Sequence, residues 1–230
     1  MKFFYIYLLS ISLNIFSATI IYTSNYIDVN SGLINNNHSI TVDGNLIKSI
    51  DSGFVKLEDD DFLIDLRGYT LMPGLMDMHV HFGQEYQSKS ERPIKVERET
   101  SAIMASKHAL TTLKAGFTTV RQVGDSGLIA ISLRNLINSD QIIGPRNFTS
   151  GKSIATTGGH ADPTNGSRKD LMGDPGPKEG VVNGVDDAKK AVRQRYKNGA
   201  DLIKITATGG VLSVAKSGQN PQFSLEEIIA

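Results

Sequence analysis

From Leu71 onward, short apolar runs alternate with helix-like segments, and this alternation is the feature that most limits the fold of the chain. Parallel strands need crossover connections, so apolar runs separated by helices are typical of parallel βαβ units. Strands are predicted at 71–81, 118–123, 148–150 and around Lys204, and helices at 99–115, 127–138 and 186–198. The pattern predicts an α/β fold, the first half of a (β/α)8 TIM-type barrel.

Before the barrel, residues 19–71 have the pattern of a small β-domain. The turn Asp43-Gly44-Asn45 lies between two alternating runs, which predicts a β-hairpin. The expected strands are 20–22, 26–29, 39–42, 46–50 and 62–66. We therefore expect part of a β-sandwich domain over 19–71 and barrel strands one to four over 72–230.

The first barrel strand is predicted to end in His79-Val80-His81. Side chains two residues apart on a strand point to the same face, so the two imidazoles can bind one metal ion. Imidazole nitrogen suits zinc and related divalent ions. The alternative is two histidines that share a half-buried strand face without binding metal.

Lys204 interrupts the apolar run of the fourth predicted strand. A buried charged lysine is unfavourable, so three explanations are open. The amine extends to solvent, pairs with a carboxylate, or has a depressed pKa that makes it reactive.

Together these segments resemble the amidohydrolase superfamily, and within it the Xaa-Pro dipeptidase and imidazolonepropionase-like branch of metal-dependent hydrolases. The motifs that carry the resemblance are residues 73–81, 116–121, 144–146, 150–151, 157–162, 203–204 and 208–213. The resemblance implies that Lys204 is carboxylated and bridges two divalent ions, with zinc expected, next to His79 and His81. It assigns His160 to substrate contact, and it places the remaining histidine ligands and the proton-transferring aspartate beyond Ala230.

The implied reaction is hydrolysis of an amide or peptide bond by a metal-activated water, as in a dipeptidase or carboxypeptidase. One alternative is a mononuclear cyclic-amide hydrolase or deaminase in which Lys204 is not carboxylated. Another is a non-enzymatic assembly protein on the same scaffold, although the presence of both His79 and His81 argues against it. The substrate side chain and the oligomeric state, including a homo-oligomer, stay open.

Composition narrows the classes of partner and ligand. Lysine plus arginine and aspartate plus glutamate both number 24, and no basic stripe indicates a nucleic-acid partner. The chain has no cysteine, so any metal must be held by histidine, carboxylate or lysine-derived ligands.

The N-terminus has the layout of a secretory signal peptide over residues 1–18, with a charged start, an apolar stretch and Ser17-Ala18. This predicts a periplasmic or secreted protein. The alternatives are a membrane anchor that runs uncleaved to Tyr22 and a core strand.

At the other end, Ser224 and Glu227 form a capping-box pattern, so a helix is expected to begin just before Ala230. A closed barrel typically needs about 250 residues, whereas 160 follow position 70. We expect the N-terminal half of a longer enzyme that is inactive by itself.

Overall fold

The computed structural model describes residues 18–83, 96–210 and 217–230. Nearly all of the predicted signal peptide and the motif residues 211–213 lie outside the described residues. The chain divides into two compact units, Met1–Pro73 and Gly74–Ala230. None of the helices in the described ranges has the length and apolar character needed to cross a membrane.

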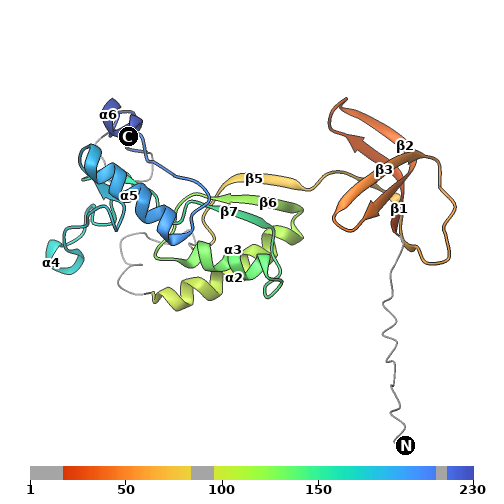
Figure 1. The fold of residues 1–230 in the computed structure, drawn as a ribbon, viewed down its shortest axis with the longest axis horizontal. Helices are drawn as coiled ribbons and strands as arrows, with labels where there is room; N and C mark the ends of the chain where they lie inside the picture. Colours follow the sequence, from red (N-terminus) through yellow and green to blue (C-terminus); the bar gives the residue numbers. More distant parts are fainter. Residues whose placement is uncertain (1–17, 84–95, 211–216) are drawn as a thin grey trace, which may run out of the picture. The chain divides into compact units, whose positions relative to one another are not determined.

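The first unit is built from four strands that form one sheet, in the order β3-β2-β1-β4 (Figure 1). The strands are β1 (Thr19–Asp28), β2 (Leu33–Asp43), β3 (Leu46–Ser52) and β4 (Phe62–Leu71). The β2–β3 pair is antiparallel, which confirms the predicted hairpin, and Gly44 in its turn has a left-handed φ of 57°.

Several strand boundaries in this unit differ from the prediction: β2 begins at Leu33, and β4 extends to Leu71. The runs 20–22 and 26–29, expected as two strands, belong to the single strand β1. The register of β1 against β4 shifts between Thr23 and Asn25, as in a β-bulge. The buried Thr23 hydroxyl donates to the carbonyls of Asn25 at 2.7 Å and Tyr69 at 3.3 Å, so the chain passes through the irregularity without a turn.

The second unit begins with a parallel sheet of three strands, in the order β5-β6-β7. Helices α2 and α3 pack on one side of this sheet (Figure 1). The elements of this part are β5 (Leu75–Val80), α2 (Arg98–Lys114), β6 (Phe117–Gln122), α3 (Ile129–Asn138) and β7 (Arg146–Thr149). The predicted βαβ arrangement is therefore confirmed.

The core between sheet and helices is a cluster of buried apolar side chains. Its members are Phe82, Ala105, Ala109, Val120, Ile129 and Leu133, with Val80, Ile137 and Ile142 packed against them. Small alanines on α2 allow the helix to approach the strands closely, and the larger residues of α3 fill the remaining space.

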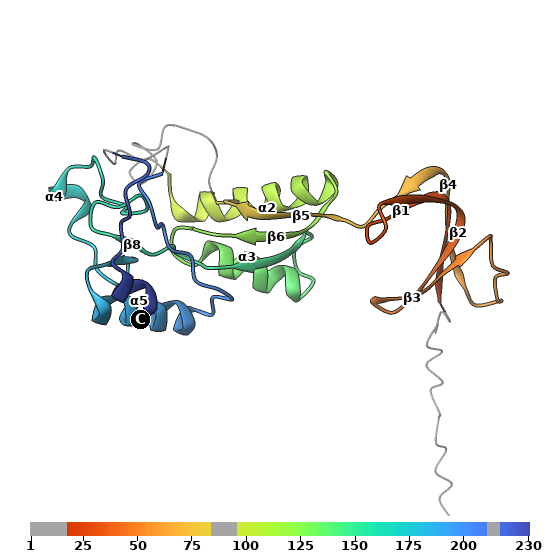
Figure 2. The ribbon, with the colours of Figure 1, turned by 90° about the horizontal axis from the view of Figure 1, so that it is seen from above.

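The remainder of this unit surrounds a second, smaller cluster of Ile154, Val182 and Ala191, with Phe223 against it. Helix α6 packs beside α5 (Figure 2). The elements are β8 (Ala155–Thr156), α4 (Lys169–Met172), β9 (Val181–Val182), α5 (Val185–Asn198) and α6 (Leu225–Ile229).

The end of α5 and the start of α6 agree with capping signals in the sequence, whereas the start of α5 does not. Helix α5 stops at Gly199, which has a φ of 87°, and α6 begins with the capping box of Ser224 and Glu227. In the sequence, Asp186 and Asp187 would be expected to cap α5, but Gly184 occupies the N-cap position. The two aspartates lie in the first turn, where negative charge complements the helix dipole.

The predicted fourth strand is present only as an isolated parallel bridge between Ile154 and Ile205. Next to it, Thr149 N donates to the Asp201 side chain at 2.8 Å, and Asp201 N donates to the Thr149 carbonyl at 2.8 Å. Two hydrogen bonds hold the bridge, from Ile154 N to Lys204 O at 2.8 Å and from Thr206 N to Ile154 O at 2.9 Å.

Gly180 gives a test of the packing between β8, β9 and α5. Its φ is +92°, and a Cβ there would overlap the Ser153 carbonyl oxygen and lie 3.0 Å from Arg195 Nη2 and 3.2 Å from Lys152 Cγ. We expect Gly180→Ala to lower the stability by about 2–3 kcal/mol, because backbone strain adds to the overlap. Gly176→Ala is the matched control, since its Cβ would meet no atom within 4 Å. Equal thermal unfolding midpoints of the two variants would contradict this packing.

Candidate active site

The candidate site is built at the carboxyl end of β5, where alternate side chains take opposite faces. Val80 and Phe82 belong to the core beneath α2 and α3. His79 and His81, together with Asp77, therefore occupy the opposite face of the strand. Burying the apolar residues is what turns the two imidazoles away from the helices.

The two imidazoles approach each other at their Nε2 atoms, which are 3.2 Å apart. Their ring centroids are 5.2 Å apart. Two nitrogens bound to one tetrahedral zinc ion at about 2.0–2.1 Å would lie roughly 3.3–3.4 Å apart. The spacing of the nitrogen pair thus fits two ligands of one divalent ion.

A backbone carbonyl orients His81. The Nδ1 of His81 donates to the Gly124 carbonyl at 2.9 Å, so the neutral ring carries its lone pair on Nε2. Metal-binding histidines usually have such a partner on the second nitrogen, because it fixes tautomer and ring orientation. This contact favours metal binding over a purely structural role for His81.

The loop that carries Gly124 is braced by Asp125. The Asp125 carboxylate accepts from the backbone N–H groups of Ser126, at 2.6 Å, and of Ala130. Burial raises the pKa of Asp125, while these two hydrogen bonds oppose the shift. The brace ties the loop to the start of α3 and so holds the Gly124 carbonyl in place.

His79 is held through its backbone, because its N–H donates to Asp77 Oδ1 at 2.9 Å. Partial burial lowers the pKa of His79, and the charges of Lys204 and His81 lower it further. The ring is therefore neutral near pH 7, which is the form that binds a metal ion.

Lys204 lies close enough to affect His79 electrostatically, which brings the fourth strand position and the end of β5 together. Its side chain is half-buried, and its backbone carbonyl is fixed by Ile154 N. Because Asp201 N donates to the Thr149 carbonyl at the end of β7, the Lys204 segment runs beside the parallel sheet that carries His79 and His81.

His160 is held by a different set of residues. Its backbone N–H donates to Gln222 Oε1 at 2.9 Å, and its ring lies against Gly210, where a Cβ would be 2.6 Å from Nδ1. These two contacts come from two segments that are distant from His160 in the sequence.

In the described ranges, no group of three or more histidine, cysteine, aspartate or glutamate side chains could hold a metal ion. His79 and His81 could supply two ligands of a metal ion, and Lys204 could add a further one. The donor set fits a divalent ion with an incomplete shell.

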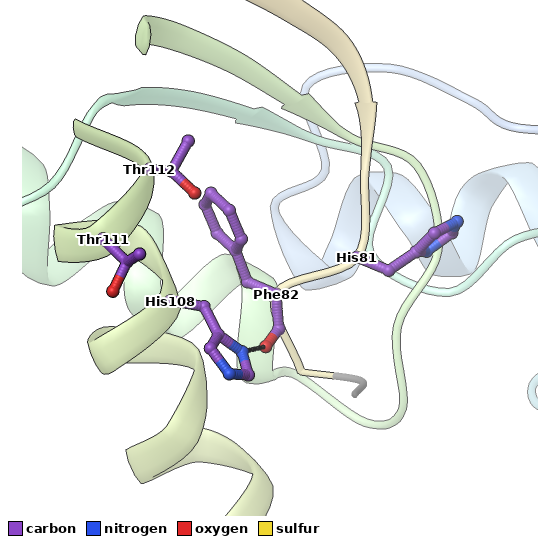
Figure 3. Close-up of a pocket in the computed structure, with 5 residues that line it drawn as sticks. All are labelled: His81, Phe82, His108, Thr111 and Thr112. Atoms are coloured by element: carbon purple, nitrogen blue, oxygen red, sulfur yellow. Dashed lines mark hydrogen bonds between the residues drawn. The ribbon is translucent and has the colours of Figure 1, made fainter. Parts of the chain in front are cut away.

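An open depression of about 290 Å³ lies near this site but on the α2 side of the strand. His81, Phe82, His108, Thr111 and Thr112 line it (Figure 3). The His81 ring points away from the Phe82 and His108 side chains (Figure 3), so the depression is separate from the paired Nε2 atoms.

Its place next to Lys107 on a predicted helix suggests that His108 is solvated, and the structure shows that this interpretation is wrong. Its Nδ1 donates to the carbonyl of Phe82 at 2.8 Å, directly after His81. Position 108 follows the buried Ala105 by three residues and so lies on the same side of the helix, which is a signal the sequence offered. The contact between His81 and the Gly124 carbonyl could not be predicted from the sequence, because every residue has a backbone carbonyl.

The amidohydrolase family model matches residues 70–230. The chain belongs to the amidohydrolase family. This confirms the resemblance and the predicted α/β fold class, and amidohydrolases are metal-dependent enzymes.

Amidohydrolases of known structure resemble most of the chain. A Xaa-Pro dipeptidase with bound methionine in its active site is 62% identical, with a TM-score of 0.86, over 92% of this chain and 52% of that one. A prolidase complexed with N-methylphosphonate-L-proline is 32% identical, with a TM-score of 0.80, over 92% and 52%.

Ochratoxinase from Aspergillus niger is 30% identical over 171 residues, which are 69% of this chain and 35% of that amidohydrolase. The chain thus spans about half of the similar structures and about a third of this relative.

Gly124 offers a test of His81 orientation. Its φ is +154°, and a Cβ there would lie 3.3 Å from His81 Cε1 and 3.5 Å from Ser153 Oγ. We expect Gly124→Ala to weaken metal binding by about tenfold in the folded protein, because the ring must turn. Gly127→Ala is the control, since its φ is +69° but its nearest contacts are Arg98 atoms at 3.8 Å or more. Equal zinc affinities of both variants would refute the carbonyl's role.

Proposed function

We propose that the protein is a metal-dependent hydrolase that cleaves an amide or peptide bond, as a dipeptidase or carboxypeptidase does. The observation that carries the proposal is the pair of facing Nε2 atoms of His79 and His81, with His81 oriented by a backbone carbonyl. The similarity to a Xaa-Pro dipeptidase and a prolidase supports a small peptide substrate.

In this proposal His79 and His81 bind one divalent ion, with zinc the expected metal. Lys204 would be carboxylated: its neutral Nζ would form a bond to the carbon of carbon dioxide and release a proton to water, and the carbamate oxygens would supply ligands for a second ion. Bound ions would lower the pKa of a water molecule and polarise the substrate carbonyl. His160 binds and orients the substrate from its loop. We assign no general acid or base to the described residues.

The central test uses protein expressed from the complete gene and the variants His79→Ala, His81→Ala and Lys204→Ala. Each removes a ligand, so we expect loss of bound zinc and a fall of at least about 10³-fold in hydrolysis of Xaa-Pro dipeptides. Metal content per chain and dipeptide turnover are measured on the same samples. His160→Asn is the control, because His160 is proposed to bind the substrate and not the metal. This variant should keep its zinc while KM rises.

Two outcomes would contradict the proposal in different ways. Near-wild-type turnover and zinc content in His79→Ala would show that His79 is not a metal ligand and would rule out the proposed metal site. One ion per wild-type chain, unchanged in Lys204→Ala, would favour the mononuclear cyclic-amide hydrolase or deaminase. In the two-metal case, formate or acetate should partly restore Lys204→Ala by replacing the carbamate oxygens.

We also propose export of the protein to the periplasm or the medium through residues 1–18. Expressed with its native N-terminus, the mature chain is expected to begin near Thr19, outside the cytoplasm. N-terminal sequencing and cell fractionation check this. An intact Met1 on cytoplasmic protein would contradict export, and an intact Met1 in the membrane fraction would favour the anchor.

A further inference from the structure

Asp201 lies three residues before Lys204 and makes contacts with two other elements. Its Oδ2 is 2.6 Å from Arg134 Nη1 of α3 and accepts from Thr149 N, at the end of β7, at 2.8 Å. Its own backbone N–H donates to the Thr149 carbonyl at 2.8 Å. One carboxylate therefore ties the segment of Lys204 to both a strand and a helix.

The Arg134 side chain is held in place for this contact. Its side chain is 12% exposed, and its Nε and Nη2 atoms donate to Asn135 Oδ1 at 3.1 and 2.9 Å. The remaining Nη1 points to Asp201, whose side chain is 31% exposed. An ion pair this sheltered and additionally hydrogen-bonded is better defined than an exposed surface pair.

The segment from Asp201 to Ile205 alternates between two faces. Ile203 and Ile205 line an apolar cavity with Ala188 and Val192 of α5, so the odd positions face the helices. Lys204 takes the opposite face and acts electrostatically on His79. A slip of one residue would exchange the faces and put Lys204 against the apolar helix side.

Backbone pairing opposes such a slip with only three hydrogen bonds, from Ile154 N to Lys204 O, from Thr206 N to Ile154 O and from Asp201 N to Thr149 O. The Lys204 segment forms an isolated bridge with Ile154 rather than a continuous ladder. The Asp201 carboxylate adds a contact that depends on side-chain identity, because a slipped register would leave Arg134 and Thr149 N without it. A misplaced charge is costly, so the ion pair selects the register.

We propose that the Arg134–Asp201 pair positions Lys204: it fixes the register that keeps the lysine on the face of His79 and His81. The inference rests on the proposed function, in which Lys204 is a metal ligand. Asp201 and Arg134 act through Lys204 and do not contact the metal themselves.

The test is zinc titration of metal-free protein, expressed from the complete gene, in competition with a chromophoric chelator and below the unfolding temperature. Asp201→Asn keeps an oxygen for Thr149 N but loses the charge that pairs with Arg134. We expect the dissociation constant of the Lys204-dependent zinc ion to rise at least about tenfold. Arg134→Gln should raise this dissociation constant as well. It leaves the Asp201 carboxylate and its hydrogen bond from Thr149 N in place, so it serves as the second variant if Asp201→Asn does not fold.

Asp187→Asn is the matched control, because Asp187 has a similar exposure of 29% and its partners, Lys190 at 3.4 Å and Asn183 N at 3.3 Å, lie in and just before α5. It should leave zinc binding unchanged. If Asp201 had a purely structural role, Asp201→Asn would lower the unfolding temperature and leave the zinc affinity of the folded protein unchanged.

The outcomes separate the two proposals. If Lys204→Ala loses zinc while Asp201→Asn and Arg134→Gln bind it as the wild type does, the positioning role is overturned and the proposed function stands. If Lys204→Ala itself keeps wild-type zinc binding, Lys204 is no ligand and both proposals fall.

Discussion

The candidate site depends on the alternation of side chains along β5. Burial of Val80 and Phe82 against α2 and α3 leaves one direction for His79 and His81. The free energy that fixes the imidazoles is thus largely that of the apolar core on the other side of the strand, at about 25 cal/mol per Å² buried. Substitutions that loosen this core should disturb the site without touching it.

Alternation sets the face, whereas backbone carbonyls set the finer geometry. The carbonyl of Gly124 accepts from His81, and the carbonyl of Phe82 accepts from His108. Both contacts lie in segments that follow strands of the parallel sheet, which is where barrel enzymes place their chemistry. The scaffold can therefore change loop side chains while these main-chain acceptors stay in place.

Much of this arrangement was predictable, for reasons that individual elements make plain. The parallel strands β5–β7 and helices α2 and α3 follow from apolar periodicity, and the end of α5 follows from Gly199. The placement of His79 and His81 on one face needs nothing beyond the period of a strand.

What escaped prediction depends on partners distant in sequence. The continuity of β1 through Thr23 requires a carbonyl at Tyr69, 46 residues away, and the tautomer of His81 requires one 43 residues away. The contact of the Asp201 carboxylate with Thr149 N likewise joins residues that are 52 positions apart. Local patterns carry no information about such pairs.

Charge explains why Lys204 would need modification to serve as a ligand. As an ammonium group it lowers the pKa of His79, which means that it repels positive charge at the position where the imidazoles would hold an ion. A divalent cation would experience the same repulsion more strongly, since the Coulomb energy scales with charge. Carboxylation replaces one positive charge by one negative charge and so turns repulsion into attraction. Metal binding and lysine carboxylation should therefore favour each other, because each removes the electrostatic obstacle to the other.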